Sequence, residues 1–475
     1  MTLTLNEIRV MLGLAPHPTD DDAVRRMGHP SSVESATGYS IDSRTTVPGD
    51  LFFAIHGERF DGHDFVGEAL KAGAVAAVIE ESHRAKLAEY TDRLILVPDA
   101  LAALQQLARE VRRKWRGTVL AVTGSVGKTT TKEMIATALA GKYQVLKSHG
   151  NLNNQYGLPL QLLKLEQHHA MAVLEMGMSA PGEIAALAAI AEPNCGVITA
   201  VAPVHTEFFS DGIAGVARAK RELVEALPAD GIAFLNADDP RVLAMREHTQ
   251  ARVVMFGRSE TADVRAVNIE DRGAEGIAFQ VQARGEQAEF QLRLVGAHNV
   301  TNALAAVAVG LEFQMSLPEI SAALAAMLPP EGRGQTLHID GAIVINDCYN
   351  SNPLALDSMV NALVGVQAQR RIVVAGEMME LGPDAAAMHA ACGRHMAQAG
   401  VHQVIGVRGN ARSIVEAAAA AGVPAAFVET PEEAGDWLAA NLRPGDAVLL
   451  KASRGVKLER ALQRLLQLRQ SPAAK

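Results

Sequence analysis

A glycine-rich segment of this sequence has the residue types and spacing needed to bind a nucleotide's phosphates. Gly124 and Gly127 enclose a short turn, and Lys128 follows directly. The apolar run 119–122 before the turn is typical of a strand, and the run 134–139 after it favours a helix. Main-chain N–H groups of such a turn and the positive end of the helix attract phosphate, while the lysine reaches the outer phosphates. The segment therefore predicts that ATP or GTP is bound here.

One position departs from the usual phosphate-loop pattern. In G-x-x-x-x-G-K-[ST] the first glycine would stand at position 122, where this chain has Val122. The order of strand, loop and helix still agrees with a phosphate loop, and Thr129 after the lysine offers a hydroxyl to Mg²⁺.

Polar side chains follow the next two strand-like runs. Glu175 ends the first of them, and His205 and Glu207 follow the second. Because parallel strands deliver their carboxyl ends to one edge of a sheet, these groups are expected near Thr129. Carboxylate, hydroxyl and imidazole groups can hold a divalent metal ion. The sequence thus predicts a metal site at this edge.

The elements that must position these residues point to an α/β fold with three domains, since one core rarely grows beyond roughly 300 residues. Residues 1–98 predict a small α/β domain, and residues 99–328 a central P-loop-like ATPase domain with a mainly parallel sheet. Residues 329–475 alternate strands with helices of 10 to 15 residues. That alternation predicts a Rossmann-like, doubly wound C-terminal domain.

Composition excludes several classes of protein. A formal net charge of −9 provides no overall basic field for nucleic acid or anionic lipid. The start of the chain lacks the pattern of a signal peptide, and no apolar run reaches the roughly 18 residues that span a bilayer. Cys195, Cys348 and Cys392 are widely and irregularly spaced, which favours reduced thiols over disulfides or a thiolate metal site. We expect a cytoplasmic protein without membrane insertion.

Sequence blocks along essentially the whole chain resemble the Mur ligase family. The blocks are residues 41–44, 48–55, 61–63, the phosphate loop, 151–154, 157–159, 174–177, His205, 296–299 with Asn302, 331–333, 347–353, 376–382 and 451–455. The resemblance implies that the N-terminal domain holds a UDP-sugar through Ser43 and Arg44. It also implies that the cofactor ATP is bound between the other two domains, which must come together for the reaction.

The resemblance further implies roles for single residues. Residues implied to bind ATP are Gly124, Ser125, Val126, Gly127, Lys128, Thr129, Thr130, Asn299, Asn302, Arg333 and Asp347. Among them Asn299 is implied to approach the adenine, Arg333 the γ-phosphate and Asp347 the ribose. Implied Mg²⁺ ligands are Thr129, Glu175, His205 and, if carbamylated, Lys220. Lys128, His205, Lys220 and Arg333 would be catalytic.

The blocks at 347–353 and 376–382 resemble the family member that adds a dipeptide. The implied reaction activates the terminal carboxylate of UDP-N-acetylmuramoyl-tripeptide as an acyl phosphate, and the amine of D-alanyl-D-alanine then displaces phosphate. The product would be the pentapeptide precursor of peptidoglycan. Asn350 and Asn352 are candidates for contacting the dipeptide, and Glu207 or another carboxylate for accepting the amine's proton. A monomer is expected.

Two alternatives stay open at this point. A folylpolyglutamate synthase-like ligase would resemble the central and C-terminal domains but would lack the N-terminal UDP-binding unit, against which residues 42–44 argue. A P-loop NTPase switch would hydrolyse ATP without needing a carboxylate and an amine together.

Overall fold

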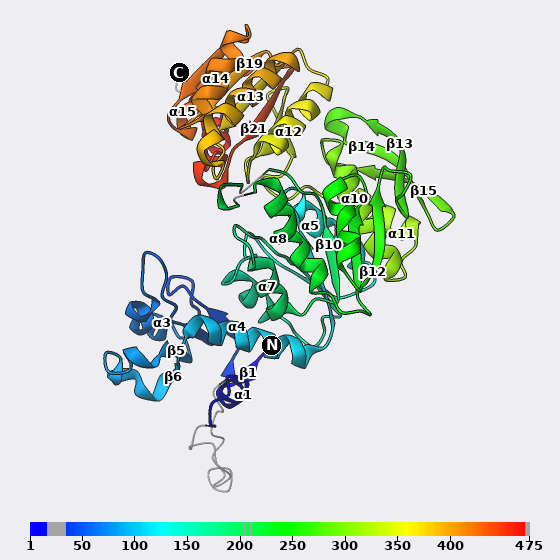
Figure 1. Cartoon of the computed structure of the whole chain (residues 1–475). Coiled ribbons are helices and arrows are strands. Elements are labelled where there is room, and N and C mark those ends of the chain that lie inside the picture. Colours follow the sequence, from blue (N-terminus) through cyan, green and yellow to red (C-terminus); the bar gives the residue numbers. More distant parts are fainter. Residues whose placement is uncertain (17–34, 204–205, 210, 471–475) are drawn as a thin grey trace.

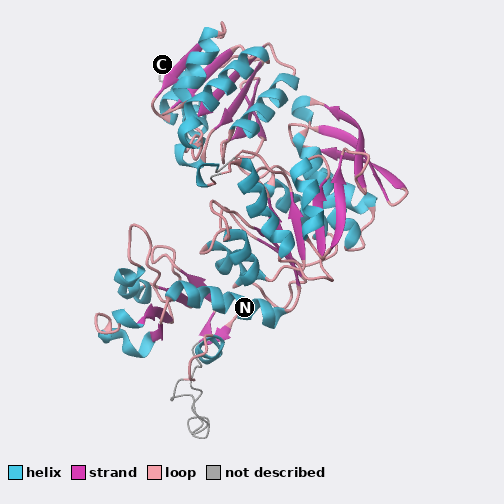
Figure 2. Cartoon of the chain, viewed as in Figure 1, coloured by secondary structure: helices cyan, strands magenta, loops and turns pink. Residues whose placement is uncertain are grey.

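The computed structural model describes residues 1–16, 35–203, 206–209 and 211–470. Three α/β domains follow one another along the chain, each built around its own sheet, with the N- and C-terminal domains on either side of the central one (Figures 1 and 2). The expected α/β, three-domain fold is confirmed.

The N-terminal domain contains a four-stranded parallel sheet of order β3-β4-β5-β6. Its strands are β3 (Gly38–Ser40), β4 (Asp50–Phe53), β5 (Ala76–Glu80) and β6 (Leu94–Val97). Its other elements are β1 (Leu3–Thr4), α1 (Leu5–Met11), β2 (Ser35–Ala36), η2 (Gly62–Phe65), α3 (Val66–Lys71), η3 (Glu81–His83) and η4 (Ala88–Arg93). The long helix α4 (Ala100–Trp115) packs on α1 and the sheet and also on two helices of the central domain, so it joins the two domains.

The central domain is built on a nine-stranded sheet of order β15-β14-β13-β12-β11-β10-β7-β9-β8. Its parallel strands are β7 (Thr118–Thr123), β8 (Val145–Lys147), β9 (Met171–Glu175), β10 (Cys195–Ile198), β11 (Ile232–Asn236), β12 (Arg252–Gly257) and β13 (Val264–Asp271). The helices are α5 (Lys128–Leu139), α6 (Gly157–Leu162), α7 (Glu183–Ala191), α8 (Ile213–Glu225), α9 (Pro240–Leu243), α10 (His298–Glu312) and α11 (Leu317–Ala326), with short turns η5 (Thr206–Phe208), η6 (Ala244–His248) and η7 (Gly273–Glu275). Strands β7, β9 and β10 are neighbours, so their carboxyl ends meet at one edge.

An antiparallel meander extends this sheet on one side. Strand β14 (Ile277–Ala283) pairs with β13, and β15 (Glu286–Leu292) pairs with β14, both in antiparallel register. Buried apolar residues alternate with wholly or partly exposed residues along β14, and the buried side chains share one core with α10 and α11. A half-buried sheet face of this kind requires period-two alternation.

The C-terminal domain has a six-stranded sheet of order β16-β17-β21-β18-β19-β20, in which only β16 is antiparallel to its neighbour. The strands are β16 (Gln335–Ile339), β17 (Ala342–Asp347), β18 (Arg370–Gly376), β19 (Gln403–Val407), β20 (Ala425–Val428) and β21 (Asp446–Lys451). The helices are α12 (Pro353–Gly365), α13 (Ala385–Gln398), α14 (Ala411–Ala420), α15 (Pro431–Asn441) and α16 (Glu459–Gln470), with turns η8 (Gly382–Asp384) and η9 (Arg454–Val456).

Both faces of this sheet are covered by helices. Val373 and Val404 belong to the core with α12, α13 and α14, whereas their neighbours Ile372 and Ile405 belong to the core with α15 and α16. Because consecutive side chains of a strand point to opposite faces, buried residues at every position require two covering layers. The doubly wound prediction is confirmed.

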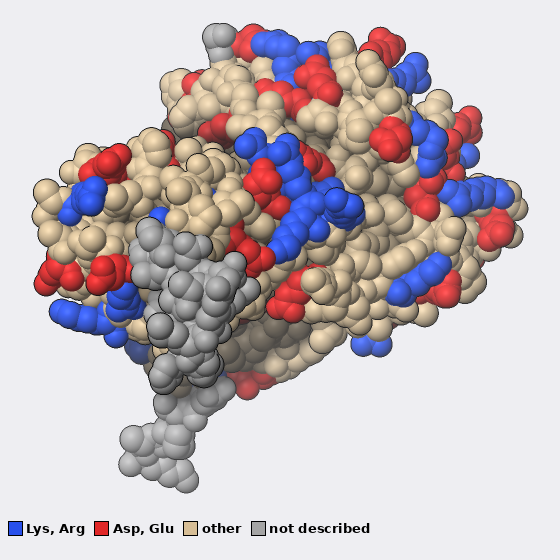
Figure 3. Space-filling view, turned by 90° about the horizontal axis from the view of Figure 1, so that it is seen from below, with Lys and Arg blue, Asp and Glu red and all other residues tan. Residues whose placement is uncertain are grey.

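Charged side chains of both signs are interspersed over the face shown in Figure 3. Ion pairs such as Lys114 with Glu7 and Arg113 with Glu192 join basic to acidic groups. Among the described residues, no helix is long and apolar enough to cross a membrane.

Candidate active site between the central and C-terminal domains

The predicted phosphate loop connects β7 to α5 in the middle of the parallel strands. Gly127 has a φ of +82°, and a side chain there would collide with Asn302. A side chain at Gly124 would collide with Thr199, which follows β10. Both positions therefore require glycine. Val122 is fully buried inside β7, so the departure from the usual pattern falls in the strand and leaves the turn intact.

Lys128 begins α5 and folds its side chain back over this turn. Its Nζ donates hydrogen bonds to the carbonyl oxygens of Gly124, at 2.8 Å, and Ser125, at 3.4 Å. Burial lowers the pKa of Lys128, the negative charge of Glu175 opposes that shift, and the positive charge of Arg333 adds to it. The loop lysine, a strand-end carboxylate and an arginine of the C-terminal domain thus share one electrostatic environment.

Glu175 is buried at the end of β9, and donors hold both of its carboxylate oxygens. The hydroxyl of Thr129 donates to Oε2 at 2.7 Å, and the amide of Asn153 donates to Oε1 at 2.9 Å. The sequence predicted the pairing of Thr129 with Glu175. The sequence places Asn153 in a family block but predicts no role for it. In the structure its amide is the second hydrogen-bond donor to this carboxylate.

A buried lysine behind this pair was missed. Lys132, on α5, is only 1% exposed, and its Nζ donates to the carbonyl oxygen of Ser148 at 2.5 Å and contacts Glu133 at 2.9 Å. The hydroxyl of Ser148 accepts the main-chain N–H of Glu175 at 3.0 Å. Lys132 therefore ties the phosphate-loop helix to the strand end that carries Glu175. A lysine on a helix gives no sequence signal for such burial, because most lysines are exposed.

Most predicted site residues line one cavity of about 820 Å³ between the central and C-terminal domains. The predicted residues that line it are Ser125, Val126, Gly127, Lys128, Thr129, Thr130, Glu175, Asn299, Asn302, Arg333, Asp347, Asn350 and Asn352. Residues more than 200 positions apart in the chain thus face one space, as the domain arrangement inferred from the resemblance requires.

The C-terminal side of the cavity carries two organised cations. The guanidinium carbon of Arg333 lies 4.1 Å from the ring centroid of Tyr349, which fixes the plane of the arginine. Lys451, at the end of β21, contacts the carboxylate of Asp347 at 2.5 Å and the carbonyl oxygen of Asn350 at 2.9 Å. Asp347 therefore has a buried cationic partner that the sequence did not predict.

The predicted asparagines are also engaged in local hydrogen bonds. Asn302 accepts from the hydroxyl of Thr131 at 3.1 Å and donates to Asn299 at 3.0 Å, so it links α10 to the phosphate-loop helix. Asn352 caps α12 by accepting from the N–H of Ala355. These bonds give the asparagines a structural role in shaping the cavity wall.

Lys220 lies on α8 and does not line the cavity among the described residues. Its side chain is almost completely buried, and burial, together with the nearby charge of Lys128, lowers its pKa well below the usual value. A neutral amine is the form that reacts with carbon dioxide, so the environment is compatible with carbamylation. His205, predicted as a metal ligand and a catalytic residue, lies outside the described residues.

Ser43 and Arg44 lie apart from the cavity, in the N-terminal domain just after β3. Arg44 forms a two-pronged, exposed ion pair with Asp42, and the hydroxyl of Ser43 donates to Glu68 at 3.0 Å. The structure therefore separates the residues predicted to hold the UDP-sugar from the phosphate loop.

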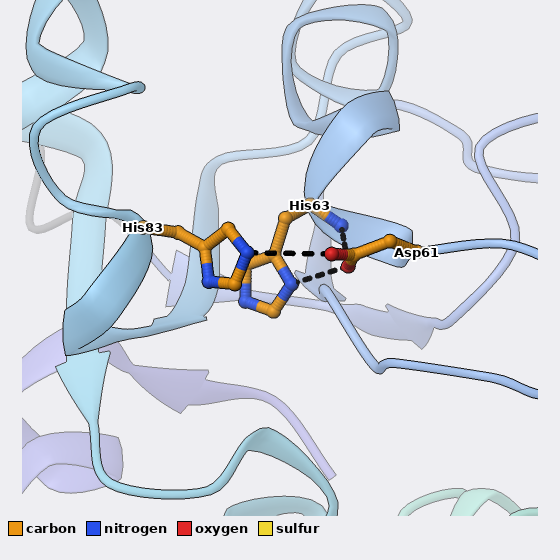
Figure 4. A group of neighbouring side chains, drawn as sticks. All are labelled: Asp61, His63 and His83. Carbon is orange, nitrogen blue, oxygen red and sulfur yellow. Dashed lines mark hydrogen bonds and ion pairs between the residues drawn. The ribbon is translucent and has the colours of Figure 1, made fainter.

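A cluster in the N-terminal domain resembles a metal site at first sight: Asp61, His63 and His83 converge (Figure 4). His63, however, has both ring nitrogens engaged, since Nδ1 lies 2.6 Å from Asp61 and Nε2 accepts the N–H of Glu80 at 3.0 Å. A metal ligand needs a free nitrogen lone pair. The ring of His63 therefore serves as a buried link that fixes the carboxylate.

The charge of Asp61 stabilises this link. Burial by itself would raise the pKa of Asp61, but hydrogen bonds from the main chain and ring of His63 and the electrostatic attraction of the two nearby imidazoles outweigh it and lower the pKa to about 2. A carboxylate with a depressed pKa contributes stability above its unfolded pKa of about 4, and that contribution is lost as the pH falls towards 2.

Asp61→Asn should accordingly lower the free energy of unfolding at neutral pH by about 1–3 kcal/mol, because the charged acceptor shared by the two histidines is removed. Thermal unfolding of the full chain between pH 2 and 7 measures the effect, and the difference in stability between variant and parent should narrow below about pH 4 and close near pH 2. Asp64→Asn removes an exposed pair with Lys86 and serves as the control. Equal destabilisation by both variants would contradict the assignment.

Models of three Mur ligase domains match the chain. The Mur ligase family catalytic domain matches residues 35–112, the Mur ligase middle domain 122–310, and the Mur ligase glutamate ligase domain 332–454. Together with the cavity between the second and third of these regions, they define the class: the chain belongs to the Mur ligase family.

Within the family the chain is similar to one kind of ligase. A protein of Bacillus subtilis named "UDP-N-acetylmuramoyl-tripeptide--D-alanyl-D-alanine ligase" is 34% identical to it over 90% of this chain and 93% of the relative. A protein of the same name from Mycobacterium tuberculosis H37Rv is 37% identical over 88% of this chain and 90% of the relative. A crystal structure of MurF from Acinetobacter baumannii matches with a TM-score of 0.85 and 29% identity, covering 98% of this chain and 99% of that one. MurF ligase from Thermotoga maritima in complex with ADP matches with a TM-score of 0.78 and 30% identity, covering 91% and 97%.

Proposed function

We propose that this chain uses ATP to join D-alanyl-D-alanine to UDP-N-acetylmuramoyl-tripeptide, forming the pentapeptide precursor of peptidoglycan. The observation that carries the proposal is the cavity in which the phosphate loop and Glu175 of one domain face Arg333 and Asp347 of another. The named relatives and the ADP complex of a similar ligase support the same activity.

The chemistry follows from the charges that meet in this cavity. A carboxylate is a poor electrophile, so the tripeptide's terminal carboxylate first attacks the γ-phosphate of ATP and forms an acyl phosphate and ADP. Two anions approach each other in that step. Lys128 and Arg333 offset their repulsion and stabilise the charge on the transferring phosphoryl group, which is the main source of catalysis in phosphoryl transfer.

The second step is attack of the dipeptide's amine on the acyl carbon, with loss of inorganic phosphate. The amine must first lose a proton, and Glu207 on η5 is a candidate acceptor. It lies beside Gly382 of the C-terminal domain, so it is at the boundary between the two domains that enclose the reaction.

The oxygen donors of Thr129 and Glu175 fit a divalent cation, because a hydroxyl and a carboxylate in contact are ligands that Mg²⁺ prefers. Mg²⁺ held there would neutralise charge on the phosphates of ATP. His205 and a carbamylated Lys220 would complete the metal sites. The remaining roles proposed are Asn299 for adenine and Asp347 for ribose.

We assign the UDP-sugar to residues 1–98 through Ser43 and Arg44, ATP to residues 99–328, and the closing domain to residues 329–475. Asn350 and Asn352 would contact the dipeptide. The protein would act as a cytoplasmic monomer on small molecules, without a nucleic acid partner.

Phosphate release measured with ATP, UDP-N-acetylmuramoyl-tripeptide and D-alanyl-D-alanine, omitting each in turn, tests the proposal. Release should require all three, because ATP and the tripeptide must first form the acyl phosphate and the dipeptide's amine must then displace phosphate from it. Replacing UDP-N-acetylmuramoyl-tripeptide with folate, and the dipeptide with glutamate, tests for folylpolyglutamate synthase activity. A solved folylpolyglutamate synthase shares the fold over 78% of this chain at 16% identity. ATP hydrolysis with neither acceptor present would instead favour an NTPase switch.

A further inference from the structure

The carboxyl ends of β18 and β21 lie side by side at one edge of the C-terminal sheet. The two strands are neighbours, but the chain leaves them towards opposite faces of the sheet. After β18 it enters α13 on one face, and after β21 it enters α16 on the other. In doubly wound sheets, ligands bind where chains leave adjacent strands in opposite directions. The residues at this point are therefore candidates for contacting a substrate.

Ser453 holds the loops at these strand ends in place. Its hydroxyl accepts the N–H of Met379 at 2.9 Å and donates to the carbonyl oxygen of Ser351 at 3.3 Å. The loops that follow β17, β18 and β21 are thus tied at a single side chain. These two hydrogen bonds hold the main chain at Ser453, and therefore fix where the side chain of the next residue, Arg454, begins.

Arg454 projects a cation from this fixed point. Its side chain is 60% exposed, and its guanidinium carbon lies 5.5 Å from the centroid of Tyr349, the ring that also holds Arg333. Tyr349 lines the cavity, so Arg454 lies next to the cavity wall. Its ion pair with Glu459 is partly exposed and can be exchanged for another carboxylate at little cost.

The other nearby cations have partners of their own. Lys451 is 3% exposed and bound to Asp347, and Arg408 donates to the carbonyl oxygen of Gly455. Arg333 faces the phosphate loop in the proposed reaction. Among the described residues at this edge, Arg454 is the best-placed guanidinium for an incoming anion.

The upper limit on the distance between the two guanidinium groups leaves room for one dipeptide. Since both guanidinium carbons lie against one ring, at 4.1 Å and 5.5 Å from its centroid, they are no more than about 10 Å apart. An extended dipeptide spans about 7 Å from its amine to its carboxylate. An amine that attacks an acyl phosphate beside Arg333 therefore leaves its carboxylate within reach of Arg454.

We propose that Arg454 binds the free carboxylate of the dipeptide acceptor and so sets the distance between that carboxylate and the attacking amine. The inference rests on the proposed function. A planar guanidinium can bind a carboxylate through two parallel hydrogen bonds, which fixes orientation as well as position.

Steady-state kinetics with D-alanyl-D-alanine and with its C-terminal amide test the assignment. In the parent protein kcat/KM should favour the acid over the amide by about tenfold or more. Arg454→Met should raise the KM for the acid and bring the acid-to-amide ratio close to one, with the KM values for ATP and the nucleotide-sugar unchanged. Arg454→Lys, which keeps the charge, should restore part of the preference.

Arg460→Met is the matched control, since it removes another exposed ion pair, with Glu432, from the following helix. It should leave the preference for the acid unchanged. A parent preference for the acid that survives in Arg454→Met overturns the inference. A parent protein whose phosphate release does not depend on the dipeptide refutes the proposed function instead, so the two failures are distinguishable.

Discussion

Replacing Lys128 with alanine is expected to abolish formation of the acyl phosphate and to lower kcat/KM by about a thousandfold or more. The Nζ of Lys128 sits on the carbonyl oxygens of the phosphate loop, where a γ-phosphate would meet it, and no other lysine lines the described cavity on the central-domain side. Loss of the charge leaves the repulsion between the two reacting anions largely uncompensated. ADP production in single-turnover reactions measures the effect.

Binding of the nucleotide-sugar should survive this change, because Ser43 and Arg44, proposed to hold it, lie in a turn of the N-terminal domain, apart from the cavity. Isothermal titration with UDP-N-acetylmuramoyl-tripeptide checks that point. Lys142→Ala, which removes an exposed lysine beyond the other end of α5, provides the control. Substantial ADP production by Lys128→Ala would show that the loop lysine does not assist phosphoryl transfer.

Arg333→Ala should lower kcat by about 10³-fold, with a smaller effect on the KM for ATP. The arginine reaches the cavity from the C-terminal domain, and its charge acts on Lys128 across the domain boundary. A guanidinium placed at the transferring phosphoryl group stabilises the charge that builds up in the transition state more than it stabilises the bound ground state. Rapid-quench measurement of acyl-phosphate formation separates this effect from product release.

Arg333→Lys should recover little activity, because an ammonium group cannot stack on Tyr349 as the planar guanidinium does. Arg412→Ala, which removes an exposed arginine of the same domain paired with Glu429, should behave like the parent protein. The role assigned to Arg333 fails if its alanine variant loses ATP affinity but keeps the parental rate of acyl-phosphate formation.

The elements with strong local periodicity were predictable. Strands and helices of the C-terminal domain alternate regularly, and the structure confirms the doubly wound sheet. The antiparallel strands β14 and β15 were not predicted, although β14 alternates apolar and polar residues and the turn Arg284-Gly285 follows it. Strand β13 pairs with β14 in antiparallel and with β12 in parallel register, so the change of direction within one sheet depends on long-range pairing.

The site was predictable only in part. The turn around Gly124, Lys128 and Thr129 is local, so its strand, loop and helix could be read along the chain. Arg333 and Asp347 were connected with that turn by family resemblance, because no periodicity relates residues some 200 positions apart. The hydrogen bonds of Asn153 and the burial of Lys132 left no signal of their own.

By itself, then, the sequence determined the phosphate loop, the order of strands and helices in the last domain and the kind of chemistry to expect. Only the tertiary structure decided which side chains hold the reactive ones: Lys451 pairs with Asp347 across 104 residues, and Lys132 with the carbonyl of Ser148 from another element. The reason is physical. Turns and amphipathic faces depend on neighbours within a few residues, whereas the partner of a buried charge is whichever group the packing of distant segments brings within hydrogen-bond distance.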